Sequence, residues 1–534
     1  MSFINARTTL IWSVELLMTL TANAQPPPGA PAPGAAHFDI SEIRVIGNGS
    51  VLPSVQIERV IYPFVGPDKT IEDLNAARSA LEKAYHSQGY GTVFVDLPEQ
   101  KIVGGLIRMK VTEGRLESVH VTGSRYYSNA QILAAIPEAT PGNVPNLPKL
   151  QREIAAANAV TTDRSIVPVL HAGSEPGTVD LALNVQDRMP VRASIEFNNQ
   201  QSEGTKPLRG LVSFGYDNLF GRLDQFSIQY EESPQEPSEV GVLATSLAVH
   251  LYEGGPALSM YYVYSKTNVV STGLGVLGKG DIYGLRLPFN FVNEAELSST
   301  LTFGMDYKHY LQSINATGTA LDTPISYVMF SADYAGAWRR PQWQATLDTS
   351  VNFGAPEIVN DPSEFAAARY QGRPNFFYLR GNAAATYTLP GGMHLTTRLG
   401  GQTAGGALLN YEYFSIAGAD GVRGYLEAEE FGDNAIKGTL QLASPQWHLF
   451  SAAATGDLFA FFDDGHVTFL STLPAQAPTP TPPTHAYLRS VGAGFDLLAT
   501  RHFTSSLTWA YPLVTGPYTT RGDSRLLFVV RGSL

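Results

Sequence analysis

With 534 residues, the chain is longer than a single soluble core usually is, so we expect several domains. A net charge of −12 argues against a nucleic-acid partner, because such proteins normally present a basic face. The absence of cysteine excludes disulfide scaffolds and thiolate metal sites, and it suits export through an oxidising periplasm. Beyond the N-terminus no apolar run reaches about 18 residues, which argues against a helical membrane span but leaves a membrane β-barrel open.

Residues 1–24 have the features of a secretory signal peptide. Arg7 supplies a positive charge, Leu10 to Leu20 form an apolar stretch, and Ala22-Asn23-Ala24 provides the small residues of a cleavage site. Residues 25–37 are rich in proline, which predicts an extended linker without a core of its own. We therefore expect an exported chain whose folded part begins near residue 38.

Two copies of one pattern follow the linker. The segment Glu42–Asn48 is echoed 76 residues later by Ser118–Ser124, and in both an alternating strand ends at a glycine. A self-similar period of this length indicates a duplicated small domain. We place the first copy at residues 38–113 and the second at residues 114–188.

Each copy is expected to contain two helices and two further strands. In the first copy Thr70 can cap a helix that Gly89 ends, and strands at 92–97 and 106–113 follow. In the second copy Ser128 and Gln131 predict a capping box. Further along, a striped helix begins near residue 147, with strands at 165–171 and 179–185. This β-α-α-β-β order resembles that of POTRA domains.

From residue 189 to residue 534 the sequence changes to alternating segments. Leu301, Phe303 and Met305 would share one face of a strand, and Thr302 and Gly304 the other. About sixteen such segments of ten or more residues can be counted, and an even number is what a bacterial outer-membrane barrel needs to close. The expected fold class is therefore an all-β transmembrane barrel of about sixteen antiparallel strands, preceded by two small α+β domains.

The expected connections between these strands alternate between tight turns and longer loops, as in outer-membrane barrels. The tight turns are placed at 218–222, 253–256, 339–342, 390–392 and 499–502. The longer loops are placed at 267–278, 312–323, 355–374, 408–433 and 471–484. We expect the glycine-rich loop 408–433 to fold inward, into the barrel.

Two motifs in this region point to an interaction across the lumen. The first is Val422-Arg423-Gly424-Tyr425 in loop 408–433, and the second is Phe461-x-Asp463-x-Gly465 on an otherwise apolar strand. An arginine fork and a carboxylate can form a bidentate, charge-assisted pair. We therefore expect Arg423 to meet Asp463 on the inner wall and to fix the loop there. The candidate loop residues are Val422, Arg423, Gly424 and Tyr425, and the candidate wall residues are Phe461, Asp463 and Gly465.

Each of these residues also has a plainer interpretation. Arg423 could be an ordinary solvated loop cation, and Phe461 could simply fill the interior. Asp463-Asp464-Gly465 could be a calcium-binding motif or a hairpin turn, since Asp-Gly is a common turn signal. The eleven histidines are scattered, and neither a His-Glu-x-x-His motif nor a nucleophile elbow is present. We accordingly expect no catalytic residue, no metal site and no cofactor.

The paired modules, the barrel and the two motifs together resemble the transporter component of two-partner secretion. This resemblance implies that POTRA domains in the periplasm recognise a large, unfolded exoprotein and that the barrel secretes it through the outer membrane. Its expected partners are the exoprotein, outer-membrane lipid and, during biogenesis, the barrel-assembly machinery, with no nucleic acid.

Three alternatives to a secretion transporter stay open. They are an insertase-like chaperone of the same superfamily, a passive porin and a barrel enzyme. Transporters of this type often carry a plug helix, but only about a dozen residues separate Ala24 from Phe38. Either loop 408–433 alone closes this pore, or the true start of the protein lies upstream.

Overall fold

The computed structural model describes residues 37–534, except 48–50, 253–254, 267–269, 272–275, 295, 317–318, 357, 450–453 and 472–483. The expected signal peptide, nearly all of the linker and any plug before residue 37 lie outside the described residues. The chain divides into two compact units. One comprises Met1–His120, Ile136–Ala155 and Pro168–Leu183, and the other comprises Val121–Ala135, Ala156–Val167 and Asn184–Leu534.

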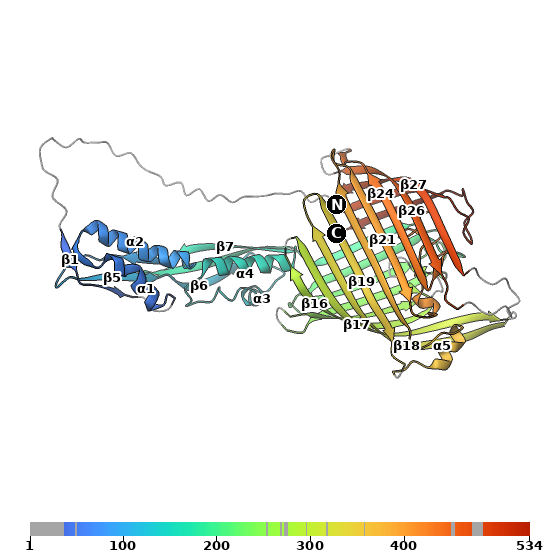
Figure 1. Cartoon of the computed structure of the whole chain (residues 1–534), viewed down its shortest axis with the longest axis horizontal. Helices are drawn as coiled ribbons and strands as arrows, with labels where there is room; N and C mark the ends of the chain where they lie inside the picture. The colour runs from blue at the N-terminus through green and yellow to red at the C-terminus, as the bar shows by residue number, and fades with distance from the viewer. Residues whose placement is uncertain are drawn as a thin grey trace. The chain divides into compact units, whose positions relative to one another are not determined.

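The first module is a small sheet covered by helices (Figure 1). Its main sheet has the order β2-β5-β4, with β2 parallel and β4 antiparallel to β5. Thr70 caps α2 as expected, because its side chain accepts from Asp73 N while the Asp73 carboxylate accepts from Thr70 N. Its elements are β1 (Phe38–Ile40), β2 (Glu42–Ile46), α1 (Ser54–Ile61), η1 (Tyr62–Phe64), β3 (Gly66–Lys69), α2 (Ile71–Ser87), β4 (Val93–Asp96) and β5 (Leu106–Glu113).

The second module repeats this order with a sheet arranged β6-β8-β7. Its elements are β6 (Arg115–Thr122), α3 (Asn129–Ala134), α4 (Leu147–Val160), β7 (Arg164–Ala172) and β8 (Thr178–Asp187). The predicted capping box at Ser128 is wrong in its second half. Ser128 Oγ accepts from Gln131 N at 3.2 Å, but the Gln131 side chain donates instead to Asn218 Oδ1 at 2.9 Å. A long-range partner has displaced the local one.

The remaining chain forms a closed antiparallel barrel (Figure 1). The last strand pairs with the first, with Val530 opposite Phe197, so the ring has no free edge. Four strands are shorter than the ten residues expected. The sixteen long strands are β9 (Val191–Asn198), β10 (Arg209–Leu219), β11 (Asp224–Glu232), β12 (Gly241–His250), β13 (Ala257–Ser265), β16 (Gly280–Asn293), β17 (Leu297–Ala316), β18 (Thr319–Arg339), β19 (Trp343–Gly354), β20 (Phe377–Thr388), β21 (His394–Ala404), β24 (Asn434–Ala443), β26 (Thr455–Thr468), β27 (His485–Thr500), β28 (Phe503–Pro512) and β29 (Arg525–Ser533). The two-residue β25 (Trp447–His448) only extends the pairing of β26.

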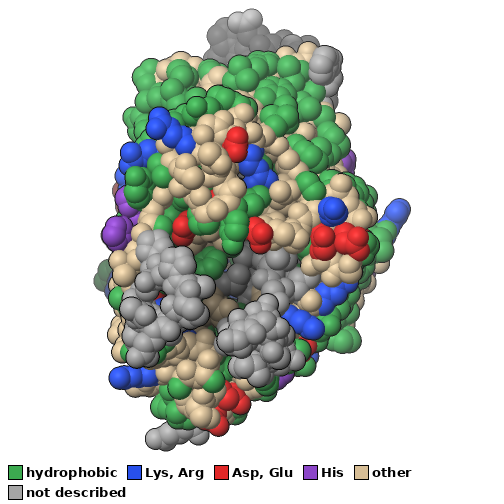
Figure 2. Space-filling model, turned by 90° about the vertical axis from the view of Figure 1, so that its right-hand side faces the viewer, with side chains coloured by type: hydrophobic (Ala, Val, Ile, Leu, Met, Phe, Trp, Pro, Cys, Tyr) green, Lys and Arg blue, Asp and Glu red, His purple; other side chains and the backbone are tan. Residues whose placement is uncertain are grey.

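The two faces of the barrel strands differ as the sequence predicts. On β17, Phe303 and Met305 are exposed on the outside, whereas Gly304, Asp306 and Lys308 are buried on the inside. On the face of the molecule shown in Figure 2, hydrophobic side chains gather mainly in the upper part. None of the helices in the described part of the chain is both long and apolar enough to cross a bilayer.

The connections of the barrel depart from expectation in one place. Residues 312–323 were expected to form a loop, but β17 and β18 continue to pair as far as Ala316 and Thr319. The residues as far as Ala316 and from Thr319 onward satisfy their backbone groups in the ladder, so the turn signals in this segment do not mark the ends of the two strands. The connection after β19 contains α5 (Pro362–Ala368), which Asp361 caps. Most of the expected loops 267–278 and 471–484 lies outside the described residues.

The connection between β21 and β24 holds loop 408–433. It contains η2 (Asn410–Glu412), β22 (Phe414–Ser415) and β23 (Phe431–Gly432), and the two short strands pair with each other. A cavity of about 880 Å³ is lined both by this loop, through residues such as Tyr411 and Arg423, and by inward-facing wall residues such as Arg398. The loop therefore shares the interior of the barrel with this cavity.

Candidate functional site

The Arg423 side chain forms a two-pronged pair with Asp463. Arg423 Nε donates to Asp463 Oδ2 at 2.8 Å, and Nη2 donates to Oδ1 at 2.9 Å. The backbone N of Arg423 donates to Oδ2 as well, at 3.1 Å, and Nη1 donates to Gln441 Oε1 on β24 at 3.1 Å. Arg423 is 8% exposed and Asp463 is fully buried, so this pair is shielded from water. Arg423 is therefore no ordinary solvated cation.

The alternation of β26 places the second motif on the inner wall. Phe461, Asp463 and Gly465 are buried on one face, while Phe462 and Asp464 point the other way. Because residues 463–465 lie within this strand, the interpretation as a hairpin turn is wrong. Both Asp463 oxygens accept from Arg423, which argues against the calcium interpretation. In the described part of the chain, no cluster of three or more His, Asp or Glu side chains could hold a metal ion.

The two glycines of the motifs serve two different needs. A Cβ added to Gly465 would lie 3.0 Å from Ile416 Cβ and 3.0 Å from Val422 Cγ2, closer than side chains normally approach. Glycine therefore lets the loop lie directly against the strand. Gly424 has a φ of +98°, in the region that other residues rarely adopt. This conformation turns the chain immediately after Arg423.

Val422 and Tyr425 complete the attachment of the loop. Val422 is fully buried, and its backbone N donates to Ile416 O at 2.7 Å, which closes a tight turn inside the loop. The hydroxyl of Tyr425 lies 2.6 Å from Val514 O and 3.0 Å from Arg489 O, so it can donate to either carbonyl. The loop is thus attached to the ends of β27 and β28 as well as to β26.

Sequence reasoning missed Glu429, which binds the connection between β28 and β29. Its Oε1 accepts from the backbone N of Tyr518 and Thr519 at 2.9 and 2.7 Å, and its Oε2 accepts from Leu426 N at 2.8 Å. Glu427, Glu429 and Glu430 look in the sequence like a solvated acidic run. Tyr518 and Thr519 lie 89 and 90 residues from Glu429, so no local pattern could identify these two partners.

A chain in which small α+β modules precede a closed barrel with an arginine-bearing loop fastened inside has the architecture of an outer-membrane barrel protein. Comparison with known families supports this class and narrows it. The ShlB-type POTRA domain matches residues 38–114, and haemolysin secretion/activation protein ShlB/FhaC/HecB matches residues 177–476, more than half of the chain. The chain belongs to the ShlB/FhaC/HecB family of two-partner secretion transporters and is an outer-membrane protein.

Individual relatives agree with this assignment. The outer membrane transporter CdiB of Escherichia coli O6:K15:H31 (strain 536 / UPEC) is 24% identical over 523 residues, which cover 94% of this chain and 83% of the relative. Another Escherichia coli CdiB is 25% identical over 319 residues, which cover 58% of this chain and about half (53%) of the relative.

Solved structures show the same fold. CdiB from Escherichia coli matches with a TM-score of 0.58 at 20% identity, covering 96% of this chain and 93% of the other. BamA from Haemophilus ducreyi lacking POTRA domains 1–3 matches with a TM-score of 0.56 at 13% identity, covering 93% and 100%. Because the two scores are similar, the fold alone does not separate CdiB from BamA as the nearer kind of relative. The family assignment does.

Proposed function

We propose that this transporter takes a large, unfolded exoprotein (the client) from the periplasm through its POTRA modules and secretes it through the barrel. The volume of the cavity favours a client in an extended conformation. About 880 Å³ is open beside the loop, whereas even a 100-residue folded domain has a radius of gyration of about 13 Å. We propose that the client crosses as an unfolded chain and that loop 408–433 moves to let it pass.

The energy for export would come from the client itself. The periplasm supplies no nucleoside triphosphate, and the sequence carries no phosphate-binding loop. A domain that folds outside the cell gains about 5–15 kcal/mol, which would trap each exported segment. No catalytic step is needed on the transporter.

The edge strand β4 is a candidate docking place for an extended client segment. Its outer backbone groups are occupied by side chains of the neighbouring helix α2: His86 Nε2 lies 2.9 Å from Val93 O, Val95 N donates to Glu82 Oε2 at 3.3 Å, and Arg78 Nη1 donates to Val95 O at 3.4 Å. A client strand that pairs with β4 would exchange its own backbone groups for these three side chains. Such side-chain cover also prevents unwanted edge-to-edge association.

The buried pair between Arg423 and Asp463 is the observation that carries the proposed mechanism. An exposed pair contributes little, but removing one partner of a buried pair leaves an uncompensated charge and costs about 3–5 kcal/mol. The pair therefore holds the loop in one position rather than in a range of positions. We propose that the passing client must disturb this position.

The experiment is client export from cells that produce the wild type, Arg423→Ala or Asp463→Ala. The matched control is Asp464→Ala, which removes the next carboxylate on β26 and with it a pair with Arg489 on the other face. We expect export to fall at least about tenfold in both loop-pair variants and to stay normal in the control, with equal amounts of folded barrel. Normal export in all variants contradicts the proposal. Loss of other barrels on depletion would favour the insertase, and steady conductance of the wild type without client would favour the porin.

A further inference from the structure

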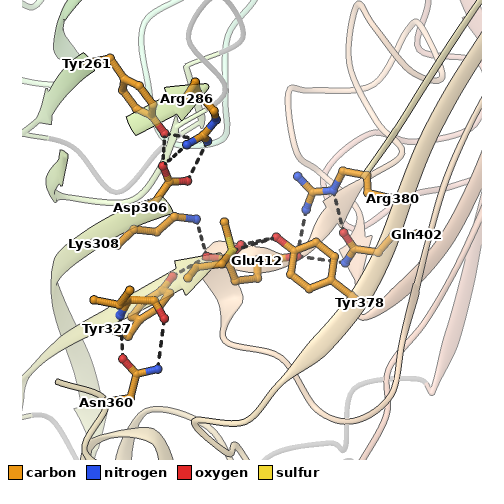
Figure 3. Close-up of polar contacts among 12 residues, drawn as sticks. Tyr261, Arg286, Asp306, Lys308, Tyr327, Asn360, Tyr378, Arg380, Gln402 and Glu412 are labelled. Carbon is orange, nitrogen blue, oxygen red and sulfur yellow. Dashed lines mark hydrogen bonds and ion pairs between the residues drawn. The ribbon is translucent and has the colours of Figure 1, made fainter. Parts of the chain in front are cut away.

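A second buried carboxylate fastens the start of loop 408–433. Glu412, at the end of η2, is 2% exposed. Its Oε1 accepts from Lys308 Nζ at 2.6 Å and from the hydroxyl of Tyr327, and its Oε2 accepts from the hydroxyl of Tyr378 at 2.7 Å (Figure 3). Neither oxygen is left without a donor. This cluster plays no part in the contacts made by Arg423.

The wall side of this cluster is buried. Lys308, Tyr327 and Tyr378 lie on β17, β18 and β20, and all three are buried. The backbone carbonyl of Glu412 also accepts from Arg380 Nη2 at 3.1 Å and from Gln402 Nε2 at 2.9 Å. Two adjoining strands therefore reinforce the attachment.

Stacking of aromatic rings adds to this attachment. Tyr411 in the loop stacks on Tyr310 of β17, with 3.7 Å between ring centroids and 8° between planes. Each ring covers one face of the other and removes this apolar area from water. The start of the loop is thus held by a carboxylate, a carbonyl and a ring together.

The two carboxylate–cation pairs lie on different parts of the wall. Around the ring, β18, β19, β20, β21 and β24 separate β17, which carries Lys308, from β26, which carries Asp463. The two pairs also differ in which partner carries which charge. At Arg423 the loop provides the cation and the wall the carboxylate, whereas at Glu412 the loop provides the carboxylate and the wall the cation. Loop 408–433 therefore spans the interior between two separate fastenings.

We propose that Glu412 is a positioning residue that locks the loop independently of Arg423, so that the pore opens fully only when both pairs are released. The inference rests on the proposed function, in which this loop closes the pore. Releasing Arg423 removes the ion pair of the tip with β26 but leaves the start of the loop bound to β17, β18 and β20. Releasing Glu412 frees the start, which lies between the tip and the strand that the loop leaves.

The first test measures the conductance of the purified full-length protein in planar bilayers without client. We expect Glu412→Gln and Lys308→Met each to raise the open probability about tenfold or more, because each leaves a buried partner without its counter-charge. The double variant should open no further than either single variant, since both remove one interaction. Restored closure in the charge-reversed double variant Glu412→Lys with Lys308→Glu supports the lock.

The matched control is Asp306→Asn. Asp306 lies two residues from Lys308 on the same inner face of β17 and accepts from Arg286 at 2.6 and 2.9 Å and from Tyr261 at 2.6 Å, all within the wall (Figure 3). The substitution breaks a luminal ion pair of similar burial that does not involve the loop. The open probability of Asp306→Asn should therefore match that of the wild type. An equal rise in Asp306→Asn and Glu412→Gln would overturn the proposal, because any damaged luminal pair would then leak.

The independence of the two fastenings is tested by tying the loop to β26 at Ile416, between Glu412 and Arg423. Ile416→Cys with Gly465→Cys would place two Cβ atoms about 3.0 Å apart, and a shift of a few tenths of an ångström allows a disulfide. With this disulfide formed, Glu412→Gln should still raise the conductance. If the disulfide abolishes the rise, Glu412 is no separate lock. Normal export by Arg423→Ala would instead refute the proposed function of the Arg423 pair. It would leave the Glu412 lock untouched, because that lock is judged by the conductance of the Glu412 and Lys308 variants.

Discussion

The guanidinium of Arg423 lies over the ring of Phe461, with 3.3 Å between its carbon and the ring centroid. The same cation donates to Asp463, two residues further along the same inner face of β26. The aromatic face of Phe461 and the carboxylate of Asp463 therefore both bind the guanidinium. This geometry needs a planar cation, because a flat guanidinium can stack and donate sideways at once. It explains why an arginine, an aromatic residue and an aspartate occur together in the two motifs.

Replacing Arg423 by lysine should not preserve function. A lysine ammonium keeps the charge but cannot make two parallel hydrogen bonds while stacking on Phe461. We expect export in Arg423→Lys to fall nearly as far as in Arg423→Ala, measured as client released per folded transporter. The matched substitution Arg489→Lys, at a half-exposed pair with Asp464, should export normally. Full export by Arg423→Lys would show that charge alone suffices.

Replacing Phe461 by leucine tests the aromatic contact separately. The change keeps an apolar side chain but removes a cation–π interaction of about 0.5–2 kcal/mol, so the open probability in planar bilayers should rise several-fold. Phe459→Leu is the control, because Phe459 is buried on the same face of β26 and packs beside Phe461. If both variants behave alike, the ring of Phe461 acts only as filling.

A side chain at Gly465 should push the loop away from the wall. Gly465→Val would collide with Ile416 and Val422, whereas Gly381→Ala on β20 adds a methyl group no closer than 3.7 Å to its neighbours. We expect single cysteines introduced in loop 408–433 to react faster with a soluble thiol reagent in Gly465→Val, and unchanged in Gly381→Ala. The chain has no cysteine of its own, so the reaction reports only on the introduced thiol. Equal rates in both backgrounds would contradict close packing at this glycine.

The side chains of α2 that occupy the outer edge of β4 should compete with the client, so removing one of them should change client binding. Glu82→Ala removes the acceptor of Val95 N and leaves this amide open to a client strand. We expect full-length Glu82→Ala to bind the N-terminal segment of the client more tightly, by up to about tenfold, in a titration with labelled peptide. Glu72→Ala, on the exposed first turn of α2, should leave the affinity unchanged. Weaker or equal binding by Glu82→Ala would place the docking strand elsewhere.

Local patterns in the sequence predicted much of the fold. The alternation of residues 301–305 correctly identified the outer and inner faces of β17, and Thr70 correctly marked the start of α2. Each signal depends on the backbone geometry of one strand or helix, so the residues of that element are sufficient to predict it. The loop 312–323 was wrong because glycine and asparagine mark a turn but do not say how far the flanking strands pair.

The contacts that attach the loop could be predicted only in part. Arg423 and Asp463 stood out because Arg423 is the one cation of loop 408–433 and Asp463 directly follows the apolar run Leu458–Phe462. Glu412 did not stand out, since its partner Lys308 is 104 residues away and no repeat or spacing links the two. Gln131 failed as a cap for the same reason, because its partner Asn218 belongs to another element. Contacts across the interior depend on closure of the whole barrel.

The most direct test of the account is client export by the variant that carries Ile416→Cys and Gly465→Cys, measured with the disulfide formed and again after reduction. In the proposed mechanism, loop 408–433 leaves the wall of β26 while the client passes. This mechanism therefore predicts that export stops when the disulfide forms and resumes when it is reduced, with the amount of folded barrel unchanged. Export at the wild-type rate with the disulfide intact would contradict it, because the client would then cross while the loop stays fastened.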